Sequence, residues 1–220
     1  MVANFKQLVI ILNNLLTEQV KLPVLHTENI MPKEIIRCPW CGSDPLYMKY
    51  HDEEWGVPLR DDDKLFEFLI LEGFQAGLSW RTILYKRENF RKAFDGFNAQ
   101  KIARYTESKV QKLLNDAGII RNRLKIAATI TNAIAYLDIR DKTNSFTDYL
   151  WQFTGGKVKK NEWRSLSEIP ARTAESDAMS KQLINDGFKF VGSTICYAHM
   201  QATGMVNDHL VDCHRYRKVL

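Results

Sequence analysis

The segment Gly187-Phe188-Lys189-Phe190-Val191-Gly192 is a compact turn between two predicted helices, and it organises the C-terminal part of the chain. Helical periodicity predicts these helices at residues 176–185 and 193–203. A turn of this kind can present backbone N–H groups, and a helix N-terminus at Ser193, to a phosphate. Lys189 adds a positive charge. Since many helix pairs turn on glycine, the turn alone is a weak indication of phosphate binding.

Almost all of the sequence between Arg37 and this turn also reads as helices joined by short connections, with few strand signals. Asp44-Pro45 is a typical helix start, with aspartate as the N-cap and proline at the first helical position. A second helix is predicted to begin near residues 61–63. Two amphipathic helices are predicted at 109–114 and 124–137, with residues 115–123 between them. The pattern therefore predicts an all-α fold.

Glu72 interrupts the apolar stripe of the second of these helices. The stripe runs Leu65, Phe68, Leu69, Glu72, Ala76, so the carboxylate should point inward. A buried charge is costly unless it meets a partner, is protonated or faces a ligand. A buried arginine or tyrosine hydroxyl would satisfy it as a structural group. A functional Glu72 would instead bind a ligand.

Four aromatic residues lie within about one helix-turn-helix of Glu72 in the sequence: Tyr47, Tyr50, Trp55 and Trp80. Flat rings combined with one hydrogen-bond acceptor can bind a nucleobase by stacking and hydrogen bonding. Each ring taken singly is also compatible with an ordinary aromatic core.

Cysteine and histidine side chains near both ends of the domain could hold a metal ion. Cys38 and His51, with the pair His209 and Cys213, supply a complete tetrahedral set for zinc. Cys38 and Cys41 form a C-x2-C pair, so a set with Cys41 in place of His51 is also chemically sensible. Two unrelated buried cysteines and two surface histidines are the alternative without a metal.

Two further residues resemble a metal pair but are interpreted differently. Cys196 and His199 are three residues apart on the predicted helix that follows the turn. We assign Cys196 to the core and expect His199 at the surface or facing a groove.

Composition narrows the broad class of protein. The 220 residues carry a formal charge of +5, and residues 1–36 are neutral because three lysines balance three acidic residues. This modest excess is compatible with a polyanionic partner. Four cysteines without a signal peptide indicate a reducing, cytoplasmic environment. The apolar run 8–16 is too short to span a membrane and predicts an amphipathic helix that packs on the body or on a second copy.

Taken together, the motifs resemble the 3-methyladenine DNA glycosylase I family. The resemblance runs from about Arg37 to Cys213, in order and with few gaps, and leaves out residues 1–36. The segments that carry it are Arg37-Cys38, Asp44-Pro45-Leu46-Tyr47, Tyr50-His51-Asp52, Glu54-Trp55-Gly56-Val57-Pro58, Leu71-Glu72-Gly73, Gln75-Ala76-Gly77-Leu78-Ser79-Trp80, Lys86-Arg87-Glu88-Asn89, Asp116-Ala117-Gly118-Ile119-Ile120-Arg121, Gly187–Gly192, Thr194-Ile195-Cys196-Tyr197 and Val206-Asn207-Asp208-His209.

The resemblance implies an all-α helix-hairpin-helix DNA glycosylase fold over residues 37–215, preceded by an extension at 1–36 and followed by a solvated basic tail at 216–220. It implies one structural zinc ion that joins the two ends of the domain, and it favours His51 over Cys41 as a ligand. It further implies a catalytic, base-binding Glu72. The implied sets are metal ligands Cys38, His51, His209 and Cys213; pocket residues Tyr47, Tyr50, Trp55 and Trp80; and DNA-binding hairpin residues Gly187, Lys189, Gly192 and Ser193.

The implied reaction is hydrolysis of the N-glycosidic bond of 3-methyladenine in alkylated double-stranded DNA, by a monomer without membrane association. Related glycosylases place an aspartate where Asn207 stands here. Bifunctional relatives carry a lysine at the position of Thr194, so a monofunctional enzyme is predicted. The alternatives are another alkylated purine, such as N7-methylguanine, as the target, or a non-catalytic zinc-containing DNA-binding module.

Overall fold

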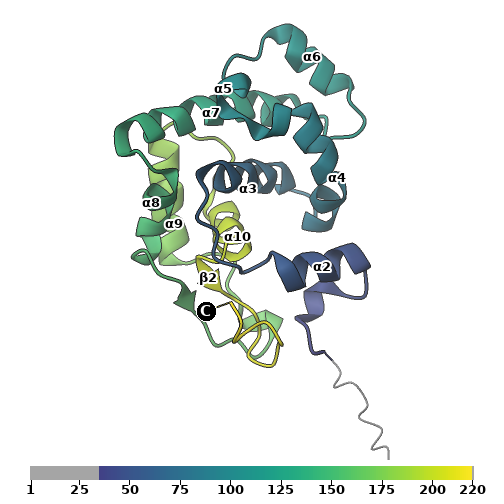
Figure 1. The fold of residues 1–220 in the computed structure, drawn as a ribbon, viewed down its shortest axis with the longest axis vertical. Coiled ribbons are helices and arrows are strands. Elements are labelled where there is room, and N and C mark those ends of the chain that lie inside the picture. The colour runs from purple at the N-terminus through teal and green to yellow at the C-terminus, as the bar shows by residue number, and fades with distance from the viewer. Residues whose placement is uncertain (1–34, 220) are drawn as a thin grey trace, which may run out of the picture. The chain divides into compact units, whose positions relative to one another are not determined.

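The structure is a computed structural model, which describes residues 35–219 (Figure 1). These residues belong to one compact unit, Ile35–Leu220. The amphipathic helix predicted at 8–16 lies outside the described residues. Within them, no helix combines the length and the apolar character that a bilayer crossing requires.

The described chain is mostly helical, as the sequence predicts. From Pro39 to Asn115 it forms η1 (Pro39–Cys41), α2 (Pro45–Glu53), α3 (Asp62–Gln75), α4 (Trp80–Ala93), η2 (Asp95–Phe97), α5 (Ala99–Ile102) and α6 (Glu107–Asn115). From Arg123 to Asn207 it forms α7 (Arg123–Thr143), α8 (Phe146–Trp151), η3 (Gln152–Thr154), β1 (Lys159–Lys160), η4 (Leu166–Glu168), α9 (Ala174–Asn185), α10 (Ser193–Ala202) and β2 (Val206–Asn207).

Side-chain caps determine where most of these helices begin. The predicted cap Asp44 accepts a hydrogen bond from the Tyr47 N–H, and Asp61 does the same for Lys64 at the start of α3. An N-cap oxygen of this kind satisfies one of the backbone N–H groups that a helix start leaves unpaired. The same device starts the helices that follow Ser79, Asn98, Asn122, Ser145 and Thr173.

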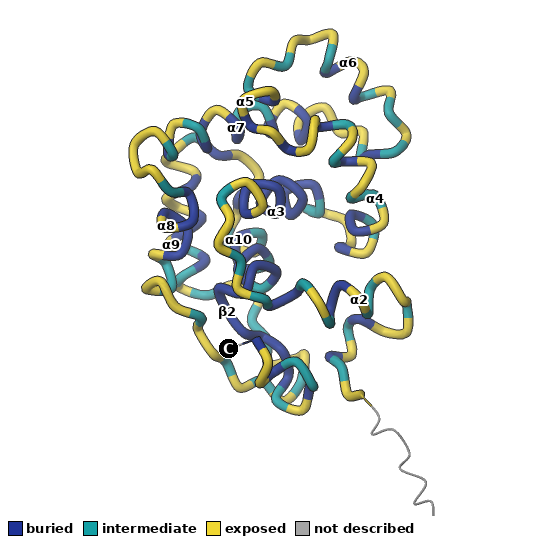
Figure 2. Tube along the Cα trace, viewed as in Figure 1, coloured by how far each residue is buried: buried dark blue, intermediate teal, exposed yellow. Residues whose placement is uncertain are grey.

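Helix α3 is the centre of the fold. Every residue from Leu65 to Phe74 is buried (Figure 2). Figure 1 shows α3 between α7 and α10, and it also packs against α4 and α8. At its start, the Asp62 carboxylate accepts from the backbone N–H groups of Phe146 and Thr147 at 3.0 and 2.8 Å, which caps α8. A helix buried on all sides is apolar around its whole circumference, and the buried stretch from Leu65 to Phe74 is so except for Glu67 and Glu72.

The two strands are short and parallel, with Lys159 paired to Val206 and Lys160 to Asn207. They fasten the segment after η3 to the segment that follows α10. The predicted basic tail is only partly solvated. Arg217 and Lys218 are exposed, whereas Tyr216 and Val219 are 6% and 3% exposed and pack into the body.

The connection between α2 and α3 packs directly on the turn after α10. The N–H of Gly56 donates to the Gln201 carbonyl, and the N–H of Leu59 donates to that of Thr203. Gly204 has φ +68°, and a Cβ there would lie 2.5 Å from the backbone of Val57 and Pro58. Only glycine fits this contact.

We therefore expect Gly204→Ala to lower the free energy of unfolding by about 3 kcal/mol, because a methyl group would meet backbone atoms that cannot rotate away. Gly156→Ala is the matched control: Gly156 has φ +75° with open space around its Cβ position. It should lose only about 1 kcal/mol. Urea unfolding of both variants measures the difference, and equal losses would contradict the close approach.

Candidate functional site

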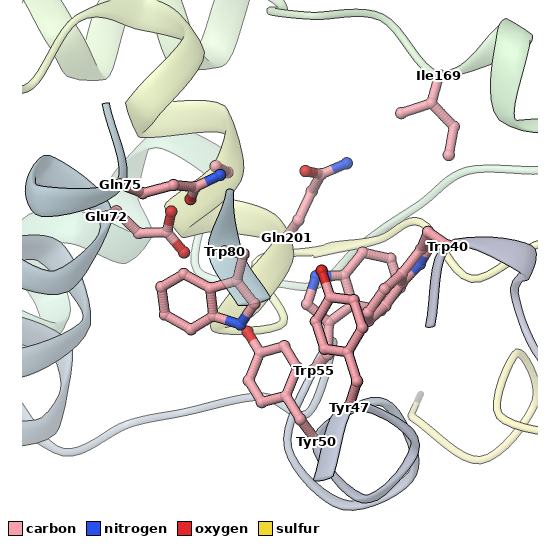
Figure 3. Close-up of a pocket in the computed structure, with 10 residues that line it drawn as sticks. Trp40, Tyr47, Tyr50, Trp55, Glu72, Gln75, Trp80, Ile169 and Gln201 are labelled. Atoms are coloured by element: carbon pink, nitrogen blue, oxygen red, sulfur yellow. The ribbon is translucent and has the colours of Figure 1, made fainter. Parts of the chain in front are cut away.

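The principal candidate site is a pocket of about 200 Å³ between α2, α3, the start of α4 and α10 (Figure 3). Figure 3 shows Glu72 and Gln75 on one side, Tyr47, Trp55 and Trp40 on the other, and Trp80 and Tyr50 between them. All five residues that the sequence analysis placed in a base pocket therefore line one cavity. The complete lining is Trp40, Tyr47, Tyr50, Trp55, Glu72, Gln75, Trp80, Ile169, Ala198 and Gln201.

Local structure explains how these side chains converge. Tyr47 and Tyr50 are three residues apart on α2, and Glu72 and Gln75 are three apart on the last turn of α3, so each pair shares a helix face. Between α3 and α4 the chain reverses through Gly77, whose φ is +78°. This short turn brings the first residue of α4, Trp80, back over the end of α3.

Glu72 is the only carboxylate in the pocket lining. Its side chain is 2% exposed, and its Oε2 atom has no hydrogen-bond partner among the described residues. Burial raises the pKa of Glu72 to about 8. The structural alternative, an arginine or tyrosine that satisfies the carboxylate, is not observed. An unpaired acceptor in a concave site is the arrangement expected for a ligand-binding group.

Two indole N–H groups in the same pocket are also unpaired. The Nε1 atoms of Trp40 and Trp80 are buried and have no acceptor among the described residues. Buried tryptophan N–H groups usually find a partner. The pocket thus holds one free acceptor and two free donors, which a polar, flat ligand could satisfy.

The aromatic rings form a box rather than a loose cluster. The Tyr50 and Trp80 ring centroids are 5.4 Å apart, and the Tyr47 and Tyr50 rings are stacked with an interplanar angle of 11°. Trp40 meets Tyr47 and Trp55 edge to face, at 5.1 and 5.0 Å. These contacts fix each ring, so the pocket is formed before any ligand arrives.

Five residues that line the pocket were not predicted from the sequence: Trp40, Gln75, Ile169, Ala198 and Gln201. Trp40 was visible only as part of the C-x2-C pair, and helical spacing from Glu72 could have found Gln75. Gln201 and Ile169 come from distant parts of the chain, and no local pattern indicates them.

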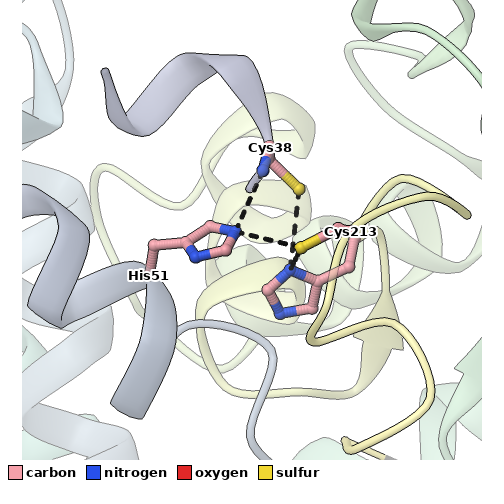
Figure 4. Close-up of side chains that lie close together, drawn as sticks. Cys38, His51 and Cys213 are labelled. Atoms are coloured by element: carbon pink, nitrogen blue, oxygen red, sulfur yellow. Dashed lines mark hydrogen bonds between the residues drawn. The ribbon is translucent and has the colours of Figure 1, made fainter. Parts of the chain in front are cut away.

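Cys38, His51, His209 and Cys213 converge in a second buried cluster (Figure 4). One ligand atom from each lies within 4.8 Å of all the others. The Cys213 Sγ is 3.4 Å from His51 Nε2 and 3.6 Å from His209 Nδ1. Sulfur and nitrogen ligands of a tetrahedral zinc ion would be about 3.5 Å apart. The cluster can therefore hold a metal ion.

The surroundings of the cluster also suit a metal. His51 Nδ1 is 2.7 Å from the Asp52 carboxylate, and His209 Nε2 is 3.1 Å from the Trp55 carbonyl. Such partners hold the outer ring nitrogen as N–H and leave the inner one free to ligate. Hydrogen bonds from Cys38 and the two histidines lower the pKa of the Cys213 thiol.

Cys41 is not part of this cluster. The alternative set of metal ligands, in which Cys41 takes the place of His51, does not match the observed cluster. The Cys41 Sγ donates instead to the Gly42 carbonyl, at 3.8 Å. Cys41 is the last residue of η1 and is buried, but it is not one of the four residues whose ligand atoms converge.

The turn Gly187–Gly192 joins α9 to α10, as predicted. Gly187 and Phe190 have φ +94° and +56°, Lys189 and Gly192 are exposed, and Ser193 is the first residue of α10. Gly192 is the N-cap and offers no side chain, so no side-chain oxygen occupies the first N–H groups of α10. These groups could bind a phosphate.

Two predictions for α10 had opposite outcomes. Cys196 is fully buried, as expected. The prediction that His199 lies at the surface or in a groove is wrong, because its ring is 0% exposed. Burial lowers the pKa of His199 to about 3, so the ring is neutral. Its periodic position alone could not show that α10 is enclosed on this side by other elements.

Asn207 and Asp208, the two residues before His209, are both occupied by hydrogen bonds, so neither is available as a base in the pocket. The Asn207 amide donates to the Tyr216 carbonyl and accepts from the His209 N–H. The Asp208 carboxylate is 1% exposed and accepts four hydrogen bonds. Its donors are Asn161, Trp163, Tyr197 and Gln201.

The unpaired, buried Glu72 predicts a pH-dependent stability. Because its pKa is raised from 4.5 to about 8, the stability associated with its protonated form is complete below about pH 4.5 and is lost as pH rises from there through about 8. Glu72→Gln should therefore gain stability relative to the unchanged chain, by about 1.4 kcal/mol per pH unit between pH 5 and 8. Melting temperatures across this range test the claim. A difference independent of pH would contradict it.

Comparison with known proteins assigns the chain to one family. A family model described as methyladenine glycosylase matches residues 40–216. DNA-3-methyladenine glycosylase 1 of Escherichia coli (strain K12) is 53% identical over 180 residues, which cover 82% of this chain and 96% of that protein.

Solved structures agree. A crystal structure of 3-methyladenine DNA glycosylase I has a TM-score of 0.80 and 51% identity, covering 81% of this chain and 98% of that one. A variant of 3-methyladenine DNA glycosylase I in complex with 3-methyladenine has a TM-score of 0.79 and 35% identity, covering 81% and 96%. The chain belongs to the methyladenine glycosylase family.

Proposed function

We propose that this protein is a DNA-3-methyladenine glycosylase, which hydrolyses the N-glycosidic bond of 3-methyladenine in alkylated DNA and so acts in DNA repair. Its relatives carry this name, and one similar structure holds 3-methyladenine. The observation that carries the proposal is the unpaired Glu72 inside the aromatic box. A module that only docks on DNA has no use for such a group.

The substrate supplies much of the driving force. Methylation at N3 makes the attached base cationic, so the bond from the base N9 to the sugar C1′ is weak. When this bond breaks, the base keeps the bonding electron pair and leaves as neutral 3-methyladenine. Water adds to C1′, gives its proton to the solvent, and an abasic site remains. The protein therefore has to bind and position the base more than to protonate it.

Glu72 recognises the base edge in this proposal. Its free Oε2 accepts a hydrogen bond from the exocyclic amine, and the positive charge of the bound base favours the ionised carboxylate. A carboxylate acceptor disfavours guanine, which would bring its O6 carbonyl to the same place. Narrow specificity for methylated adenine follows from this single contact.

The rings hold the base by stacking. Trp80 is the stacking partner because it lies over the end of α3 beside Glu72, with Tyr50 next to it. Tyr47, Trp55 and Trp40 close the opposite side. The base reaches this pocket only after it has flipped out of the duplex, at a cost of about a few kcal/mol.

The turn Gly187–Gly192 anchors the DNA in this proposal, as the hairpin of a helix-hairpin-helix motif. Gly192 and Ser193 offer backbone N–H groups to a phosphate, Lys189 adds charge, and Gly187 permits the turn. Thr194 is exposed on α10 and carries no amine, and no lysine lines the pocket. We therefore propose a monofunctional enzyme that forms no Schiff base with the sugar.

The cluster of Cys38, His51, His209 and Cys213 holds one zinc ion in this proposal. Two thiolates and two imidazoles complete a tetrahedral set, which leaves no position for water or substrate and makes the site structural. A bound ion would tie η1 and α2, which carry Trp40 and the two tyrosines, to the segment after α10.

Glu72→Gln should slow the release of 3-methyladenine from methylated duplex DNA at least about tenfold, because a neutral amide favours the cationic base less than a carboxylate does. Release is measured by chromatography of free bases at pH 7.5. Glu67→Gln provides the control, since Glu67 lies on the same helix but pairs with Arg91 outside the pocket. No base released by the folded, unchanged protein would contradict the proposed function, and release of N7-methylguanine instead would reassign the substrate.

Metal analysis should find one zinc ion per chain, and Cys213→Ser should abolish it. The variant should also melt at a lower temperature, because the ends of the domain lose their link. Cys41→Ser is the matched control: Cys41 is buried next to the cluster but outside it, and should leave the zinc content unchanged. Zinc retained by Cys213→Ser, or lost from Cys41→Ser, would contradict this ligand set.

A further inference from the structure

The turn that anchors DNA and the pocket that binds the base meet at one long helix, α7. The Asn132 side chain on α7 holds the turn by two hydrogen bonds: its Oδ1 accepts from the Lys189 N–H at 2.7 Å, and its Nδ2 donates to the Lys189 carbonyl at 3.0 Å. Asn132 is 4% exposed. The tip of the turn is therefore fixed to α7 through its backbone.

The same tip also touches the helix that carries Glu72. A Cβ at Gly73 would lie 3.4 Å from the Phe190 Cβ and 3.5 Å from the Phe190 carbonyl oxygen. These are ordinary contact distances, so the tip of the turn lies against α3 at the residue that follows Glu72. Any shift of the turn relative to α3 would therefore change this contact.

Lys125, near the start of α7, lies between the end of α3 and the tip of the turn. Its ammonium group donates to the carbonyls of Phe74 and Ala76, at 2.8 and 2.6 Å, and lies 5.9 Å from the centre of the Phe190 ring. The residue is 7% exposed and has no carboxylate partner among the described residues. Its charge is thus directed at the C-terminal carbonyls of α3, where a cation is favourable.

These carbonyls lie next to the wall of the pocket, on either side of one lining residue. Phe74 and Ala76 flank the lining residue Gln75, and the turn through Gly77 leads on to Trp80. Lys125 therefore holds the end of α3, where the turn to α4 begins. Its ammonium group also faces the ring of Phe190 at the tip of the α9–α10 turn. No other described lysine or arginine side chain has hydrogen bonds to the end of α3.

We propose that Lys125 is a positioning residue, which holds the DNA-anchoring turn and the wall of the base pocket in a fixed register. This inference rests on the proposed function. A base flipped from DNA that is anchored at Gly187–Gly192 then enters the pocket at the depth where Glu72 and Trp80 can bind it. Displacements of about 1 Å between binding and reacting groups cost enzymes up to about a hundredfold in rate.

The test separates this role from a purely structural one. We would measure three quantities for the full-length Lys125→Met variant: its melting temperature, its affinity for free 3-methyladenine by tryptophan fluorescence, and its single-turnover rate of base release from saturating methylated DNA at 20 °C. We expect the rate to fall at least about tenfold, while the affinity for the free base changes by less than about twofold. Lys125→Arg should restore most of the rate, because a guanidinium can reach the same carbonyls.

Asp62→Ala is the matched control for lost stability. Asp62 caps α8 from the opposite end of α3, so its loss should lower the melting temperature without changing the rate. Phe190→Ala is a second variant in case Lys125→Met does not fold. Phe190 is 38% exposed, and its truncation removes the same link from the outer side. It should show the same loss of rate with an unchanged affinity for the free base.

Lys125→Met with an unchanged rate, or with a loss of rate matched by the loss of free-base affinity, would overturn the inference. So would Phe190→Ala at the unchanged rate. An unchanged protein that binds free 3-methyladenine but releases none from DNA would instead contradict the proposed function.

Discussion

The burial of α3 from Leu65 to Phe74 is the constraint on which the rest of this structure depends. A helix enclosed on every side has no solvent-facing stripe on which to place a charge, so a carboxylate on it must find a partner or a ligand. The Asp62 carboxylate accepts a hydrogen bond from a backbone N–H group at the start of α3, and the Glu67 carboxylate forms an ion pair with Arg91. The Oε2 atom of Glu72 has no such partner among the described residues, and Glu72 lines the aromatic pocket. The fold thus accepts a destabilising group at the one place where a cationic base would compensate for it.

A second feature is that the pocket is assembled from elements far apart in the chain. η1 and α2 carry Trp40, Tyr47 and Tyr50, yet they lie at the edge of the domain rather than in its core (Figure 1). The cysteine and histidine cluster brings Cys38 and His51 to the segment after α10, and backbone hydrogen bonds join the α2–α3 connection to the end of α10 as well. The backbone of one pocket residue, Trp55, also accepts from His209, so the cluster and the pocket share a wall. Stability of the chain ends and geometry of the pocket are therefore linked.

In the proposed function, recognition of the base and anchoring of the DNA would use different parts of the structure. Side chains that close the pocket come from η1, α2, α3, α4 and α10, whereas the turn between α9 and α10 exposes mainly backbone groups. Backbone contacts to phosphate carry no sequence information, which suits an enzyme that must find a lesion anywhere in a duplex. Helix α7 contacts the turn through Asn132 and the end of α3 through Lys125.

Local signals in the sequence determined the helical class, the helix starts at Asp44 and Asp61, the inward direction of Glu72 and the family, because capping and periodicity act over a few residues and the motifs occur in order. Tertiary structure alone decided which distant residues meet. It buried His199 and brought Gln201 into the pocket, and it brought His51 to the two C-terminal ligand candidates, as the family resemblance implied and local spacing could not decide. These outcomes depend on which neighbour covers each face, and that information resides in contacts between residues far apart in the chain, which local patterns do not encode.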